Sequence, residues 1–246
     1  MKIIALYSIK GGVGKTAAAV NLAFLAAQEA AQTLLIDLDP QGAASYYFRI
    51  KPSKKLKTKT LLKGSTSIDQ NIKATDFEHL DLLPSDMTFR NLDLALNRMN
   101  HSKKILNKLF KPFQNTYEFI FLDAPPNLTL VSENIFNAAD VLLVPVKPST
   151  LSVNSFGRLQ EFIAAKKRDR LKVLPFFSMV EARKKFHREV MQMLTMQAPE
   201  FLKQAIPYSV DVENMGIHRE PITCFRPSSP AAKAFSALWR EIKMVA

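Results

Sequence analysis

The stretch Tyr7–Val20 reads YSIKGGVGKTAAAV, and three of the seven glycines of the chain lie in it, at positions 11, 12 and 14. This concentration of glycine indicates that the backbone approaches another group closely. The run GKT matches the end of the phosphate-binding pattern G-x-x-x-x-G-K-[ST], but Ile9 stands where that pattern has its first glycine. A second lysine, Lys10, follows Ile9, and one lysine is already enough to contact a phosphate chain.

The residues of this loop suit a bound nucleoside triphosphate. Gly11, Gly12 and Gly14 allow successive backbone N–H groups to point inward around a phosphate, at the start of an expected helix. Lys15 supplies positive charge to the β- and γ-phosphate oxygens, and the Thr16 hydroxyl is placed to ligate Mg²⁺. The predicted nucleotide contacts of the segment are Lys10, Gly11, Gly12, Val13, Gly14, Lys15, Thr16 and Ala17.

Two further motifs place aspartates directly after apolar runs. Residues 34–42, LLIDLDPQG, contain Asp37 and Asp39, and residues 117–126, YEFIFLDAPP, contain Asp123. An apolar strand that ends in aspartate is the usual Mg²⁺ anchor of nucleotidases with this loop. Asp37 and Asp39 can hold Mg²⁺ through water or orient an attacking water, although acids at strand ends often only cap turns. We therefore predict Thr16, Asp37 and Asp123 as metal-site residues.

The residue after the third aspartate bears on the rate of hydrolysis. Ala124 occupies the position at which fast ATP-driven motors often carry a glutamate base. Without such a base, hydrolysis should be slow. The sequence therefore favours a molecular switch over a motor.

Short apolar runs alternate with helical segments along the chain. Expected strands are 2–7, 34–37, 81–83, 119–122, 141–144 and 172–177, and expected helices are 16–31, 91–97, 103–110, 129–137, 153–166, 187–197 and 231–244. The alternation predicts an α/β fold with a doubly wound, mostly parallel β-sheet flanked by helices on both faces. No long linker interrupts it, so residues 1–246 are expected to form a single domain. Residues 50–67 are basic and poor in apolar side chains, and they are expected to form a mobile excursion.

The composition indicates a polyanionic partner. The net charge is +12 and the isoelectric point is near 9.8, which suits DNA, RNA or an anionic membrane, with a solvated lysine-rich surface as the alternative. The single cysteine, Cys224, excludes an intrachain disulfide and indicates a reducing compartment. No uninterrupted apolar stretch reaches the roughly 20 residues of a membrane-spanning helix, and export is not expected.

The three motifs, in this order and spacing, resemble the ParA/MinD family of ATPases with a deviant Walker-A loop. The resemblance extends over nearly the whole chain. Residues 141–153, VLLVPVKPSTLSV, are similar to the strand and turn after the Mg²⁺ aspartate, residues 205–210, AIPYSV, to the segment near the adenine, and residues 229–242, SPAAKAFSALWREI, to the terminal helix. The resemblance implies ATP and Mg²⁺ as cofactors and the P-loop NTPase fold.

The resemblance also assigns roles. In the family, the lysine that corresponds to Lys10 reaches across a dimer interface to the phosphates held by the other subunit. ATP with Mg²⁺ retains about two negative charges, which such a cation would offset. The implied catalytic residues are Lys10, Lys15 and Asp39, with Asp39 positioning the water, Asp123 holding Mg²⁺ through water and Asp37 supporting the pair. Pro207 and Tyr208 correspond to adenine-side contacts.

Members of this family differ in the surface on which they act. MinD-like members bind lipid through an amphipathic terminal helix, and Phe235, Leu238, Trp239, Ile242 and Val245 have helical spacing here. Similarity to the ParA terminal helix favours packing of this stripe on its own domain. ParA-like members bind nonspecific DNA, for which the expected contacts are Lys166, Lys167, Arg168, Arg170, Arg183, Lys184, Lys185 and Arg188.

Two departures from the family pattern bear on these expectations. Chromosomal relatives carry DNA-binding arginines where this chain has Tyr208 and Asp211, so the DNA footprint is expected in the clusters between 166 and 188. Many relatives have a second threonine after GKT, where this chain has Ala17.

The expected protein is a small ParA-type ATPase without an N-terminal helix-turn-helix, cytoplasmic and associated with the nucleoid. ATP would close a homodimer that binds nonspecific double-stranded DNA, and a ParB-like adaptor would stimulate slow hydrolysis and so position a cargo. One alternative is a MinD-like membrane ATPase. Another is a metabolic P-loop ligase or reductase component, of which an iron protein is disfavoured by the lone Cys224.

Overall fold

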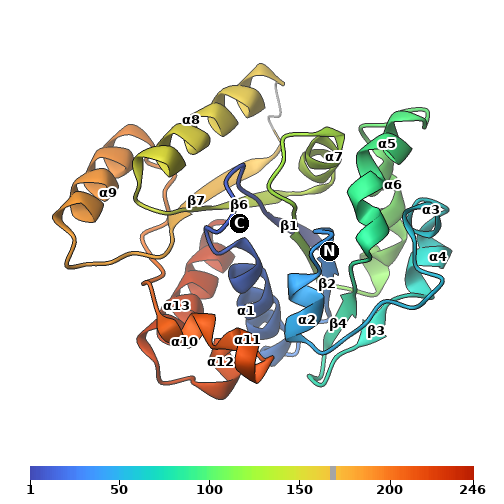
Figure 1. Ribbon diagram of the computed structural model, residues 1–246, viewed down its shortest axis with the longest axis horizontal. Helices are drawn as coiled ribbons and strands as arrows, with labels where there is room; N and C mark the ends of the chain where they lie inside the picture. Colours follow the sequence, from blue (N-terminus) through green and yellow to red (C-terminus); the bar gives the residue numbers. More distant parts are fainter. Residues whose placement is uncertain (167–169) are drawn as a thin grey trace.

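A seven-stranded sheet forms the centre of the computed structural model, which describes residues 1–166 and 170–246 (Figure 1). Its strand order is β3-β4-β2-β5-β1-β6-β7, and every neighbouring pair is parallel except β3 and β4. The strands are β1 (Lys2–Leu6), β2 (Thr33–Asp37), β3 (Lys73–Ala74), β4 (Leu80–Leu83), β5 (Phe119–Asp123), β6 (Val141–Val146) and β7 (Lys172–Phe177). The doubly wound α/β prediction is confirmed, and only the two-residue β3 was not expected.

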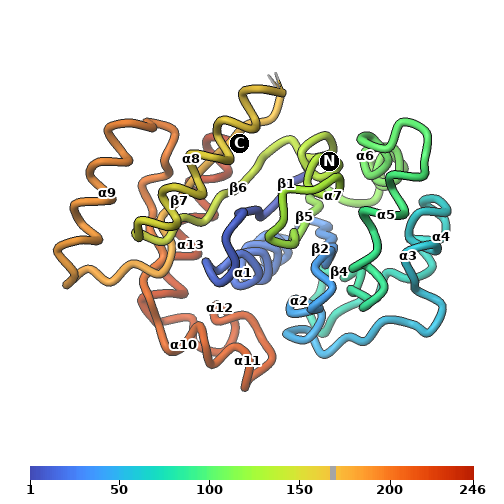
Figure 2. Tube along the Cα trace, turned by 45° about the horizontal axis from the view of Figure 1, so that its top comes forward, coloured from blue at the N-terminus to red at the C-terminus, as the bar shows by residue number. Residues whose placement is uncertain are grey.

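The sheet is covered on both faces because alternate strand residues point to opposite sides. Ile3 and Ala5 pack with α5 (Leu92–Asn97), α6 (Ile105–Phe110), α7 (Leu130–Ala138) and α8 (Thr150–Ala165). Ile4 and Leu6 pack with α1 (Lys15–Gln28), α12 (Ile222–Phe225) and α13 (Pro230–Val245). Figures 1 and 2 show α1 and α7 on opposite sides of the strands.

The strand register brings the three sequence motifs to one edge of the sheet. Asp123 at the end of β5 pairs with Leu6 of β1 on one side and with Asp37 of β2 on the other. The strands β1 and β2 are therefore not neighbours, and β5 lies between them. All three end at the same edge because they are parallel.

Several short helices were not expected from the sequence. Residues 50–67, predicted as an excursion, contain α3 (Thr58–Leu61) and the start of α4 (Ser65–Asp69). Leu56 and Leu61 within the segment and Ile68 directly after it are fully buried. These three apolar residues anchor a basic segment. They are too few to form a periodic pattern, so the sequence did not predict these helices. The other unexpected helices are α2 (Ala43–Tyr47), α10 (Val210–Glu213) and α11 (Met215–His218), besides α12; the expected α9 spans Lys185–Gln197.

The C-terminal helix α13 packs on its own domain, as favoured from the sequence. Phe235, Leu238, Trp239 and Ile242 are buried, and the Trp239 ring contacts Phe119 and Phe121 of β5. The apolar stripe that a membrane would need is therefore already covered. Among the described residues, no helix is long and apolar enough to cross a bilayer.

Candidate nucleotide-binding site

The glycine loop after β1 adopts the backbone that its composition suggests. Gly12 and Gly14 have φ of 69° and 90°, in the left-handed region that favours glycine. Gly14 caps α1, and the first N–H groups of that helix have no partner within it, so they are available to an anion. A Cβ on Gly14 would lie 2.9 Å from the Ser178 Oγ, so the loop is also pressed against the end of β7.

Lys15 lies beneath this loop. Its side chain is largely buried, and its Nζ donates to the carbonyl oxygen of Lys10 at 3.3 Å. Burial lowers the pKa of the Lys15 ammonium, and Asp123 and Asp39 oppose that shift. The ammonium therefore sits in the negative potential of the carboxylates rather than in water.

The two strand-end aspartates are fully buried and incompletely paired. The Asp37 Oδ2 accepts from the Ser45 N–H at 2.9 Å and from the Ser45 Oγ at 2.7 Å, and burial raises the Asp37 pKa to about 6. Burial, and then Asp37, raise the pKa of Asp123 well above its usual range. Within the described chain, the Asp37 Oδ1 and both Asp123 carboxylate oxygens have no hydrogen-bond partner of good geometry, and the Thr16 hydroxyl is close enough only to lower the Asp123 pKa. Buried carboxylate oxygens without partners suit a bound cation.

The donor set suits Mg²⁺ in particular. In the described chain no cluster of three or more His, Cys, Asp and Glu side chains could hold a metal unaided. Mg²⁺ is typically held by one or two carboxylates with water and substrate phosphates completing the shell. The Thr16 hydroxyl, which lowers the Asp123 pKa, is the further oxygen at this place.

Asp39 occupies the loop that follows β2. It is partly exposed, its Oδ1 accepts from the Gln41 N–H at 2.9 Å, and its carbonyl oxygen accepts from the Ser85 Oγ at 2.5 Å. Ser45 connects this loop to Asp37. Its Oγ donates to Asp37 and accepts from the N–H of Ser85, the residue that binds the Asp39 carbonyl, at 2.9 Å. Sequence reasoning missed both serines, since neither belongs to a motif.

A pocket of about 180 Å³ opens beside the glycine loop. Pro207 and Tyr208 line it together with Gly12 and Gly14, so the structure brings the predicted adenine-side residues to the loop. The Tyr208 hydroxyl donates to the Glu213 Oε1 at 2.9 Å. The lining residues that sequence reasoning missed are Ser178, Met179, Ile206, Ser209, Val212, Glu213 and Phe235.

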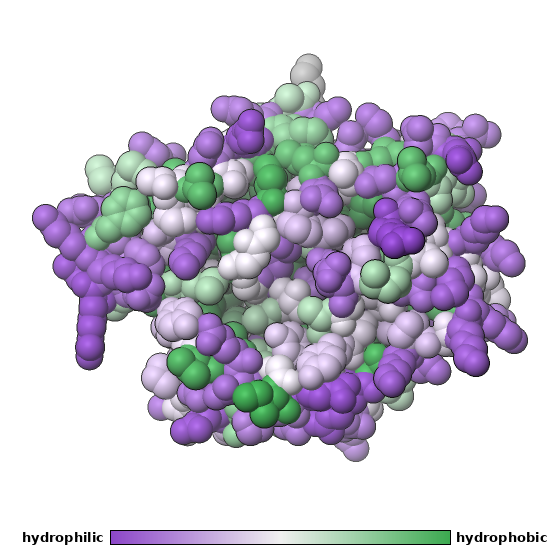
Figure 3. Space-filling view, in the orientation of Figure 1, coloured by the Kyte–Doolittle hydropathy of each residue, from purple (hydrophilic) through white to green (hydrophobic). Residues whose placement is uncertain are grey.

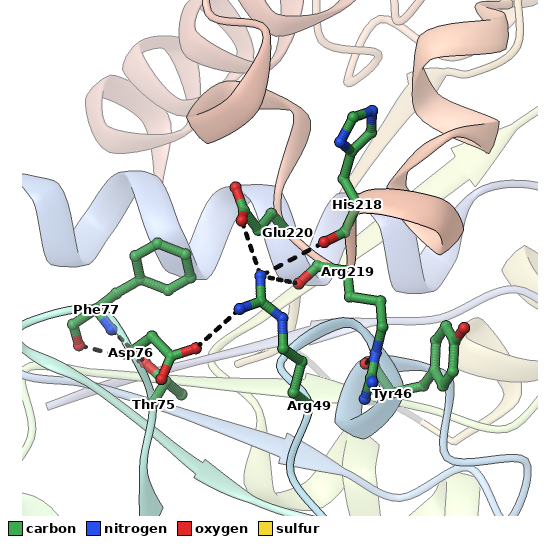
Figure 4. A network of polar contacts seen from close by, with 8 residues as sticks. All are labelled: Tyr46, Arg49, Thr75, Asp76, Phe77, His218, Arg219 and Glu220. Atoms are coloured by element: carbon green, nitrogen blue, oxygen red, sulfur yellow. Dashed lines mark hydrogen bonds and ion pairs between the residues drawn. The ribbon is translucent and has the colours of Figure 1, made fainter.

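Arg49 and Arg219 connect α2, whose Ser45 binds Asp37, to the chain segment that follows the pocket-lining residues (Figure 4). We call this pair the arginine clamp. The Arg49 guanidinium contacts Glu220 at 2.8 Å, Asp76 at 3.4 Å and the carbonyl oxygens of His218 and Arg219. In return, the Arg219 Nε donates to the Tyr46 carbonyl at 3.1 Å, and its guanidinium lies over the Tyr46 ring. The end of α2 is thereby tied to the turn between α11 and α12.

Asn21 of α1 provides a second tie. Its buried Oδ1 accepts from the Thr223 N–H at 3.2 Å and from the Thr223 Oγ1 at 3.1 Å. Its Nδ2 donates to the Ala17 carbonyl at 2.8 Å. Segment 207–225 is thus held both to the helix after the glycine loop and, through the clamp, to α2.

Lys10 points away from the phosphate loop of its own chain. Its Nζ donates to the Ser152 Oγ of α8 at 3.3 Å. No described carboxylate pairs with it. The half-buried ammonium therefore has a neutral partner, and its charge remains available to an anion from outside the chain.

The predicted DNA contacts do not form one cluster. Lys166 and Arg170 precede β7. After β7 ends, Arg183 and Lys184 directly precede α9, and Lys185 and Arg188 lie in its first turn. A six-residue strand spans about 20 Å, which separates the two groups. Lys167 and Arg168 lie outside the described residues. Figure 3 shows hydrophilic side chains at the tip over α9.

Comparison with known proteins is consistent with the fold and the motifs. A family model described as an AAA domain matches residues 1–174, and a virulence-plasmid ParA family protein of Chlamydia psittaci is 30% identical, covering 99% of this chain and 95% of its own length. The chain belongs to the ParA/MinD family of P-loop ATPases. The sporulation initiation inhibitor Soj of Bacillus subtilis is 27% identical, covering 98% of each chain.

Solved structures share the whole fold. The ATP complex of a single-residue variant of McdA from Cyanothece has a TM-score of 0.86 at 22% identity, covering 100% of this chain and 97% of its own. Cobyrinic acid a,c-diamide synthase of Mycobacterium smegmatis, with an ATP analogue and magnesium, has a TM-score of 0.78 at 22% identity, covering 98% and 93%. The same fold therefore occurs in a synthase.

Proposed function

We propose that this ParA-family chain is a slow, switch-type ATPase whose ATP-bound form is a homodimer on nonspecific double-stranded DNA. The proposal rests mainly on the surroundings of Lys10. This cation lies beside the phosphate loop, and in the described chain its ammonium has only the Ser152 hydroxyl as partner. A phosphate held by a second copy would compensate its charge. Residues 1–246 act as one domain, because the strands of the described chain form one sheet.

The proposed site uses both sides of the glycine loop. The loop N–H groups and Lys15 bind the phosphates, and Pro207 and Tyr208 contact the adenine. Thr16, Asp37 and Asp123 would hold Mg²⁺, whose charge would offset that of the phosphates. Asp39 orients the attacking water from its partly exposed loop. Ala124 supplies no base, which supports slow turnover.

The proposed partners follow from charge and from the relatives. A net charge of +12 and the cations at the start of α9 suit duplex DNA. Relatives include the chromosome-partitioning ATPase Soj of Treponema pallidum, 27% identical over 98% of this chain. We infer by analogy a ParB-like adaptor that stimulates hydrolysis, and a cytoplasmic, nucleoid-associated protein that positions a cargo.

Replacing Lys10 tests the proposal. Light scattering with a non-hydrolysable ATP analogue and Mg²⁺ should show a dimer for the unaltered chain and a monomer for Lys10→Ala. Calorimetry should show that Lys10→Ala still binds the analogue, because Lys10 faces away from its own loop, with an apparent affinity lower only by the share that dimerisation adds. Lys233→Ala, an exposed lysine on α13, is the matched control and should dimerise. A dimer that forms equally well without Lys10 contradicts the proposal.

A further inference from the structure

One of the other open grooves lies between α3 and α5, apart from the nucleotide pocket. Its volume is about 460 Å³, and in Figure 1 its walls lie at the right-hand side of the molecule. Its lining residues are Lys57, Thr58, Lys59, Thr88, Asn91, Leu94, Ala95 and Arg98. None of them belongs to the proposed nucleotide, metal or DNA contacts.

The groove is strongly cationic. There is no aspartate or glutamate between Asp39 and Asp69, whereas that interval contains six lysines and an arginine. Lys59 and Arg98 are exposed, and in the part of the chain that the structure describes their side chains have no ionic partner. Figure 3 shows hydrophilic side chains along the same edge.

Apolar surface lies among these charges. Leu94 is 64% exposed and borders the groove beside Ala95. A duplex phosphate backbone would contact the cations but would leave Leu94 uncovered. An acidic peptide with an apolar side chain satisfies both features, because it pairs with the cations and buries Leu94. We propose that this groove docks an acidic peptide segment, with an apolar anchor, of a partner protein.

The groove is connected to the loop of Asp39. The Lys57 Nζ pairs with the Asp86 Oδ2 at 3.0 Å, and the Asp86 Oδ1 accepts from the Thr88 N–H at 2.9 Å. Ser85, the preceding residue, donates to the Asp39 carbonyl at 2.5 Å. An acidic occupant competes with Asp86 for Lys57 and so shifts the segment that holds Asp39. This regulatory link, unlike docking itself, rests on the proposed ATPase function.

Fluorescence anisotropy without nucleotide tests docking. The probe is a fluorescein-labelled peptide of about twelve residues, acidic except for two leucines. The unaltered chain should bind it, and Lys59→Glu/Arg98→Glu should weaken binding about tenfold or more. Lys233→Glu/Arg240→Glu reverses one lysine and one arginine on the exposed side of α13 and should leave binding unchanged.

Three results would overturn docking: no binding to the unaltered chain, equal loss in both double variants, or equal affinity for a peptide with serines in place of leucines. Displacement of the probe by a short DNA duplex, with DNA binding lost in Lys59→Glu/Arg98→Glu, would assign the groove to nucleic acid instead. Saturating peptide should change the ATPase rate of the unaltered chain only. An unchanged rate removes the regulatory link, and absence of any ATPase activity refutes the proposed function while docking stands.

Discussion

The sheet edge with the glycine loop, which we call the nucleotide edge, and the start of α9 both carry charged side chains. These side chains are buried at the nucleotide edge and exposed at α9. At the nucleotide edge Asp37 and Asp123 have no exposed surface, and Lys15 is 7% exposed. At α9 the side chains of Lys184 and Lys185 are 56% and 83% exposed. Buried charges depend on one another because desolvation penalises each, whereas exposed charges act nearly independently. Single substitutions should therefore have large effects at the first region and small ones at the second.

Lys15→Ala should have the largest effect. ATP affinity should fall about a hundredfold or more, since charge-assisted bonds to phosphate contribute about 3 kcal/mol. Calorimetry with ATP and Mg²⁺ measures this, and Lys185→Ala is the control at an exposed site. Retained affinity would refute the assignment of the loop.

Asp39→Ala should separate binding from hydrolysis. The turnover number should fall about a hundredfold or more, because a group that positions or activates the water is lost. The ATP-bound dimer should persist in light scattering. The control is Asp69→Ala, which removes an exposed carboxylate elsewhere. A monomer with normal turnover would exclude the proposed role.

Arg49→Gln tests the clamp between the two sides of the site. Loss of its contacts should lower the free energy of unfolding by about 1 kcal/mol, and hence the melting temperature by about 2–4 °C. The KM for ATP should rise while the turnover number changes little, because the clamp holds pocket wall 207–225 rather than the reacting atoms. Arg49→Lys should restore only part of the stability, because the compact ammonium lacks the planar five-donor guanidinium that reaches these separated acceptors. An equal effect from the exposed Arg240→Gln would show that the clamp is not specific.

Neutralising one α9 cation at a time should have the smallest effect. Arg183→Gln or Lys185→Gln should weaken DNA binding only a few-fold, and the slope of log K against log salt should drop by about 0.9 per lost phosphate contact. Gel shifts over a salt series measure both, with Lys111→Gln as control. An unchanged slope for every α9 variant would place the DNA surface elsewhere.

The sequence predicted the strands well because buried parallel strands are continuous apolar runs, and 172–177 matched to the residue. It predicted less well where a segment depends on distant neighbours. The helices α10 to α12 have four residues each, about one turn, so no apolar spacing can repeat within them. They are held by Asn21 and Arg49 from far along the chain. The motifs placed Asp37 and Asp123 at the ends of neighbouring strands, but they gave no sign of Ser45, which donates a hydrogen bond to Asp37.

The sequence by itself determined the phosphate loop, because glycine spacing and GKT act locally through backbone freedom and helix polarity. It also determined the sheet and the aspartates at its edge. Only the tertiary structure decided that β5 separates β1 from β2, that Lys10 turns from its own loop toward Ser152, and that a cationic groove forms beside Leu94. These features join residues distant in the chain, and their geometry arises from packing, for which no local pattern exists.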